Sequence, residues 1–72
     1  MKQATKDKLF EAWAYCDELD KSTEFMLQYM ADSAKVEYDV ATQFVVNTTE
    51  EERAEWYKRN PNWFKRYPQI KD

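Results

Sequence analysis

A chain of 72 residues has room for one small domain. It carries 11 basic and 14 acidic residues, for a net charge of −3, and its 17% aromatic content excludes disorder throughout. Gly is absent, so turns with positive φ must use Asn or Asp, which disfavours hairpins and favours helices. His is absent, and the single cysteine, Cys16, excludes an internal disulfide and indicates a reducing compartment.

The first predicted helix runs from about Lys6 to Leu19, because apolar residues recur there with the spacing of one helical face. Thr5 is placed to cap its start, and the acidic cluster up to Asp20 favours an end near that residue. The predicted buried stripe consists of Leu9, Ala12, Trp13, Cys16 and Leu19. We expect Cys16 to be a buried apolar thiol.

Two further helices are expected in the middle of the chain. Ser22 or Thr23 can cap the first of them, which ends at a break at residues 32–33. Its predicted apolar face consists of Phe25, Met26, Tyr29 and Met30. The next helix starts near the break or at Lys35, and its stripe consists of Val36, Val40, Ala41, Phe44 and Val45. A short strand over residues 43–46 competes with it, because this run ends in two β-branched valines, but the preceding spacing favours a helix.

The clearest helix start lies at residues 47–52. Thr48 and Thr49 are each followed three residues later by a glutamate, which is the spacing of a capping box. The helix should run to Arg59, since the proline that follows Asn60 disfavours helical geometry there. On a helical wheel Trp56 points about 100° away from Tyr57, so we expect it to turn away from the core. Residues after Pro61 form a short helical turn or an extended arm.

These elements predict an all-α fold: a compact three- to four-helix bundle with a basic, aromatic C-terminal segment packed along it. We expect one small helical domain over residues 1–72, with residues 61–72 as a C-terminal arm. The apolar runs are far shorter than the roughly 20 residues of a membrane span, and no secretory signal is visible. The expected location is therefore the cytoplasm, without membrane association.

Charge is divided along the chain. Residues 1–52 hold five basic and twelve acidic residues, a net charge of −7, whereas residues 53–72 hold six basic and two acidic ones, a net charge of +4. The basic segment can fold back on the acidic part of its own chain, dock on a second copy as a homodimer, or recognise a foreign partner. The sequence leaves all three interpretations open.

Residues able to support catalysis or metal binding are scarce. Cys16 has no histidine to activate it, and zinc would need further Cys or His ligands. A helix-turn-helix is disfavoured over residues 22–45, because its reading helix would carry Glu37 and Asp39 and little positive charge. We therefore expect no enzyme activity, no cofactor and no bound metal.

The C-terminal segment is the predicted contact surface, because aromatic and arginine side chains there are of the types that dominate protein interfaces. The candidate partner-binding residues are Trp56, Arg59, Trp63, Phe64, Arg66 and Tyr67. For Trp63 and Phe64 the alternative is that they complete the small core. In size and composition alone, the chain is similar to the accessory proteins that bacteriophages direct against host machinery.

The function that we expect is a non-enzymatic protein-binding module, a small regulator or inhibitor that occupies a surface of a larger partner protein. One alternative is a nucleic-acid or nucleotide binder that uses the same basic and aromatic surface, because aromatic rings stack on bases and cations meet phosphates. Another is a homo-oligomeric structural protein in which the acidic and basic segments of different copies pair.

Overall fold

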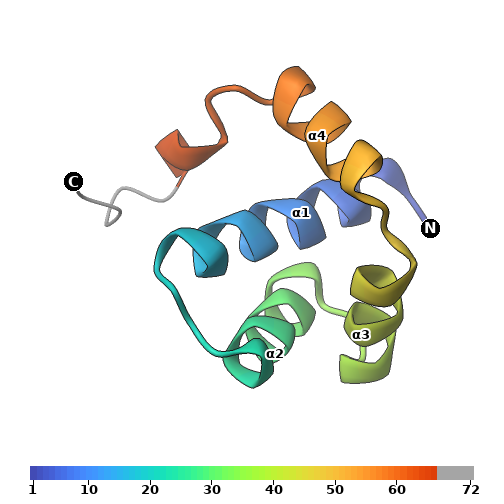
Figure 1. Ribbon diagram of the computed structural model, residues 1–72. Coiled ribbons are helices and arrows are strands. Elements are labelled where there is room, and N and C mark those ends of the chain that lie inside the picture. Colours follow the sequence, from blue (N-terminus) through green and yellow to red (C-terminus); the bar gives the residue numbers. More distant parts are fainter. Residues whose placement is uncertain (67–72) are drawn as a thin grey trace.

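The computed structural model describes residues 1–66, and these residues form four α-helices and a short 3-10 helix (Figure 1). The elements are α1 (Gln3–Glu18), α2 (Thr23–Ala34), α3 (Tyr38–Asn47), α4 (Glu50–Arg59) and η1 (Trp63–Arg66). The predicted all-α bundle is confirmed, and the competing strand over residues 43–46 is helical. Of the predicted C-terminal arm, residues 63–66 form η1, and residues 67–72 lie outside the described part of the chain.

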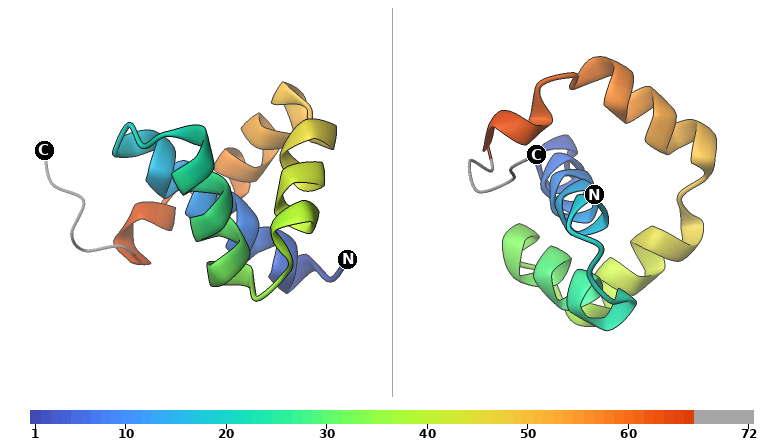
Figure 2. Two further views of the ribbon diagram at one scale, coloured as in Figure 1. Left: turned by 90° about the horizontal axis from the view of Figure 1, so that it is seen from below. Right: turned by 60° about the vertical axis from the view of Figure 1, so that its left-hand side comes forward.

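The first helix is the centre of the fold. When the molecule is viewed nearly along α1, the other helices and η1 are arranged around it (Figure 2, right). Of the 13 buried hydrophobic residues in the described part of the chain, seven belong to α1: Leu9, Phe10, Ala12, Trp13, Ala14, Tyr15 and Cys16. Over residues 9–16 they cover every side of the helix except that of Glu11, as in a helix with neighbours on all sides. The prediction of a single buried stripe was therefore incomplete.

The start of α1 and the exposure of Leu19 differ from the prediction, whereas the end of the helix at Glu18 agrees with it. The helix begins at Gln3, with Lys2 at the N-cap position and no capping hydrogen bond from a side chain, so the predicted cap at Thr5 was wrong. Leu19 is the C-cap residue and is 37% exposed, so it does not belong to the buried stripe. Cys16, in contrast, is 1% exposed, as predicted.

The start of α2 agrees with the prediction and its length does not. Of its predicted apolar face, Met30 is buried, and Met26 and Tyr29 are partly buried against the core. Ser22 is the N-cap, and its Oγ accepts a hydrogen bond from the backbone N–H of Phe25 at 3.2 Å. The helix continues through the predicted break, because the carboxylate of Asp32 faces outward and accepts a hydrogen bond from Gln28 at 3.0 Å. The buried residues of α2 are Leu27, Met30 and Ala31, whereas Phe25 is 48% exposed.

Two left-handed residues make tight turns in a chain without glycine. Asp20 (φ 56°) follows α1 and Lys35 (φ 58°) follows α2. In each turn the next backbone N–H returns to a carbonyl five residues earlier, from Lys21 to Cys16 and from Val36 to Ala31, both at 3.0 Å. This bond is typical of the Schellman motif. Asp20 fits the expectation that Asn or Asp fills such positions, and Lys35 does not.

The fourth helix has the predicted boundaries. Thr49 is its N-cap: the threonine Oγ1 accepts from the Glu52 N–H at 3.1 Å, and the Glu52 carboxylate accepts from the Thr49 N–H at 2.9 Å. This reciprocal pair is a capping box. The helix ends at Arg59, before Asn60 and the proline that follows it. Local sequence signals thus set the ends of α4, which crosses above α1 (Figure 1).

Candidate interaction surface

Trp56 fixes α4 on the central helix. Its side chain is 1% exposed, and its ring stacks on Phe10 of α1 with 5.4 Å between the ring centroids. The indole Nε1–H donates a hydrogen bond to the Asp7 Oδ1 at 3.1 Å. The prediction that Trp56 turns away from the core and faces a partner was therefore wrong.

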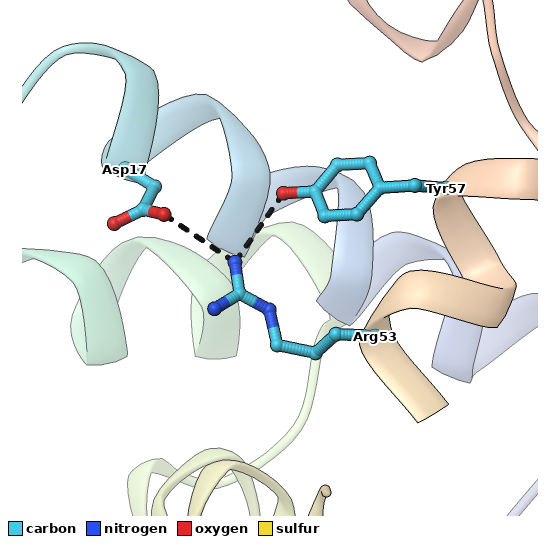
Figure 3. A network of polar contacts seen from close by, with 3 residues as sticks. All are labelled: Asp17, Arg53 and Tyr57. Carbon is cyan, nitrogen blue, oxygen red and sulfur yellow. Dashed lines mark hydrogen bonds and ion pairs between the residues drawn. The ribbon is translucent and has the colours of Figure 1, made fainter. Parts of the chain in front are cut away.

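Arg53 fixes the other edge of α4. Its guanidinium lies over the Trp13 ring, with Cζ 4.1 Å from the centroid. The Nη2 atom donates to the Asp17 Oδ2 at 3.4 Å and to the Tyr57 hydroxyl at 3.3 Å (Figure 3). Because the Asp17 side chain is 63% exposed, the ion pair contributes at most about 1 kcal/mol. The stacking on Trp13 holds the guanidinium in place.

This ion pair bears on the division of charge along the sequence. Arg53 belongs to the basic segment and Asp17 to the acidic one, so in this contact the basic segment folds back on the acidic part of its own chain. Arg53 is the first residue of the basic segment. The later cations Lys58, Arg59 and Lys65 are exposed on the surface.

The predicted contact residues whose side chains the structure describes do not form one surface. Trp56 and Trp63 are core residues, with Trp63 9% exposed, so for Trp63 the alternative role of completing the core holds. Arg59 is exposed and lines a shallow hollow over the N-terminal half of α1. Phe64 is 46% exposed on η1. Of Arg66 the structure describes the backbone within η1, and Tyr67 lies outside the described residues.

The structure adds a surface that the sequence did not indicate. A hollow of about 450 Å³ lies between α3, the start of α1 and the beginning of α4. We call it the α3 hollow; it is lined by Met1, Lys6, Asp39, Val40, Gln43, Phe44, Asn47, Thr48 and Glu52. Met1 is 62% exposed and Val40 37%, and Phe44 is partly buried with its edge against the Phe10 ring. Both Val40 and Phe44 were predicted as core residues: Phe44 packs against the core, whereas Val40 faces solvent.

The side of the hollow formed by α3 and the start of α4 is acidic. Asp39 and Glu52 line it there, and residues 36–52 hold five carboxylates and no cation. On the side of α1, Lys6 and the N-terminal ammonium of Met1 are the cations among the lining residues. An apolar surface surrounded by carboxylates favours a basic segment that carries an apolar side chain, because the cations would meet the carboxylates while the apolar side chain leaves water.

Cys16 is chemically quiet in this fold. Burial raises the pKa of the Cys16 thiol and so holds it protonated, although nearby Lys21 opposes this shift. Among the described residues there is no group of three Cys, His, Asp or Glu side chains placed to hold a metal ion. The described helices are also too short or too polar to cross a membrane.

The buried thiol gives a prediction about reactivity. We expect a disulfide reagent to modify Cys16 at least about 100-fold more slowly in the native protein than in urea, because attack requires the exposed thiolate. Because the pKa is raised in the folded state, folding stability should fall as pH rises above the ordinary thiol pKa. Absorbance of the released thiol chromophore gives the rate. Equal rates in buffer and in urea would contradict the burial.

No protein-family model, curated protein or solved structure matches this chain.

Proposed function

We propose that this chain is a non-enzymatic protein-binding module, a small regulator or inhibitor that covers a basic segment of a larger partner protein. The proposed contact surface is the α3 hollow, and the segment that it takes carries one aromatic or aliphatic anchor beside Lys or Arg. The observation that carries this proposal is the exposed apolar lining at Met1 and Val40, beside residues 36–52, which hold five carboxylates and no cation.

Two further features support a binding role. The floor of the hollow is held in place, because Phe44 packs edge-on against Phe10 with 4.9 Å between ring centroids. A rigid floor reduces the entropy lost on binding. The volume of about 450 Å³ also leaves room for one large side chain of a partner.

Nucleic acid remains the alternative ligand, but the structure weakens the argument for it. The aromatic rings of Trp56 and Trp63, which would stack on bases, are buried in the core. Phe64 keeps an exposed ring. Single-strand binding usually combines several stacking rings with a basic groove, and the exposed surface around the α3 hollow is acidic.

A labelled peptide with one Phe between Lys and Arg tests the proposal by fluorescence anisotropy. Val40→Asp should weaken binding at least about tenfold, because it removes an apolar contact at the centre of the site. The substitution adds a charge that by itself attracts the peptide, so a loss isolates the apolar contribution. Val40 is the third residue of α3, where an acidic side chain suits the helix dipole and the fold should persist.

Val46→Asp is the matched control. Val46 lies on the same helix, is 70% exposed and is not among the lining residues, so the same change in charge should leave affinity within about twofold. A second peptide with Glu in place of both cations should bind far more weakly. Equal effects of Val40→Asp and Val46→Asp, or equal binding of the two peptides, would refute the proposed surface.

A further inference from the structure

The segment chemistry that suits the α3 hollow is present on this chain itself. In η1, Trp63 is buried against the core while its neighbour Phe64 is 46% exposed. The two rings are nearly perpendicular, with an interplanar angle of 87°. Lys65 is exposed, and Arg66 follows it in the sequence. The 3-10 helix therefore presents an aromatic anchor beside basic residues.

Phe64 does not reach the hollow of its own chain. The helix α3, which carries Val40 and Phe44, and the 3-10 helix η1 lie on opposite sides of α1 (Figures 1 and 2). Phe64 is not among the residues that line the hollow. If this pairing forms, it must therefore join two molecules.

We propose that Phe64 and Lys65 of one copy occupy the α3 hollow of a second copy. This inference rests on the proposed function of the hollow and names its first occupant. Phe64 enters between Val40 and Phe44, and Lys65 faces the carboxylates of Asp39 and Glu52. The charges along the chain are also opposite, since residues 53–72 carry a net charge of +4 and residues 1–52 carry −7.

Because the two surfaces lie on opposite sides of α1, the contact is head-to-tail. Such heterologous contacts form rings or open chains rather than a closed two-fold dimer. The contact is small compared with a stable protein interface, so association should be weak, with growth in mass at about 0.1–1 mM protein. A foreign partner with a better basic segment would displace the neighbouring copy from the hollow.

Two variants with one defect each test the inference by sedimentation velocity. Val40→Asp damages the hollow and keeps Phe64, whereas Phe64→Asp damages the anchor and keeps the hollow. We expect the wild type to grow in mass over this concentration range, and each variant alone to stay monomeric. An equimolar mixture of the two variants should form a 1:1 complex, because the intact Phe64 of the Val40→Asp variant can enter the intact hollow of the Phe64→Asp variant. Nothing larger should form, because the other hollow and the other anchor of this complex are damaged.

Val46→Asp serves again as the control and should associate like the wild type. A wild type that stays monomeric at about 1 mM, or association unaffected by both variants, would overturn the inference. The Phe64→Asp variant also separates this inference from the proposed function. If that variant binds the basic peptide but the wild type does not self-associate, the hollow is a binding site and the second copy is not its occupant. If the Phe64→Asp variant does not bind the peptide and the wild type does not self-associate, both proposals fail.

Discussion

Replacing Trp56 by Ala is expected to lower the free energy of unfolding by about 3–5 kcal/mol. The side chain is 1% exposed, stacks on Phe10 and meets Tyr57 edge-on with ring centroids 5.6 Å apart. Its removal leaves a cavity between α4 and α1, and the Asp7 carboxylate loses the hydrogen bond that the indole N–H donates. Small domains are stable by only about 5 kcal/mol or somewhat more, so a large fraction of the variant should be unfolded. Urea titration followed by circular dichroism measures the loss.

Trp56→Phe is the matched control, because it keeps an aromatic ring in the core and removes the Nε1 donor. We expect it to cost about 1–2 kcal/mol, which separates the hydrogen bond to Asp7 from the packing. A Trp56→Ala variant that retains wild-type stability would show that α4 does not pack on α1 through this residue. Trp56 would then be a surface residue, as the sequence predicted.

Ala14→Glu is expected to destabilise the protein by about 3–5 kcal/mol, since it buries a carboxylate without a partner. Ala14 is 2% exposed, although it lies outside the stripe of Leu9, Trp13 and Cys16. A helix with one buried face would tolerate this change, whereas a helix surrounded by its neighbours would not. Thermal unfolding followed by circular dichroism gives the comparison.

Leu19→Glu is the opposite case. Leu19 was predicted to belong to the buried stripe but is 37% exposed at the end of α1, so the cost should be only about 1 kcal/mol. If Leu19→Glu proved the more damaging of the two, α1 would have one buried face and the central-helix arrangement would be contradicted.

The sequence predicted the features that depend on neighbouring residues. The capping box at Thr49, the cap at Ser22 and the end of α4 at Arg59 are each set within a few residues, and the structure has all three. The expected burial of Cys16 also holds, since the helical spacing places it on the same face as the buried Leu9 and Trp13.

The features that were missed depend on contacts between distant parts of the chain. α4 has few aliphatic residues, so its wheel did not identify the buried face; that face is set by Phe10 and Asp7, which are far from Trp56 in sequence. The signal that could have shown the central role of α1 is the run from Leu9 to Cys16. Its residues are apolar on every side of the helix except Glu11, and a helix of that kind must be surrounded.

The candidate site was missed for a related reason. The apolar residues of α3 span more of its circumference than two neighbouring helices can cover, so the full stripe was assigned to the core. In the structure Ala41 is fully buried, while Val40 on its flank is 37% exposed. Trp56 shows the reverse, because it was assigned to the surface and is buried in the core, and Trp63, for which both roles were open, is in the core as well. Contacts between distant residues decide which rings enter the core, since Phe25 and Phe64 are 48% and 46% exposed.

The most direct test of the central claim is to locate bound peptide on the protein by nuclear magnetic resonance. The monomeric Phe64→Asp variant, labelled with ¹⁵N, is titrated with the Lys-Phe-Arg peptide. If the α3 hollow is the binding site, the backbone amide resonances of Val40, Phe44 and Glu52 should shift on titration. The amide resonances of η1 and of the exposed residues of α2 should not shift. Shifts confined to α4 and η1, or no shifts at about 1 mM peptide, would contradict the claim that the hollow binds basic segments of partner proteins.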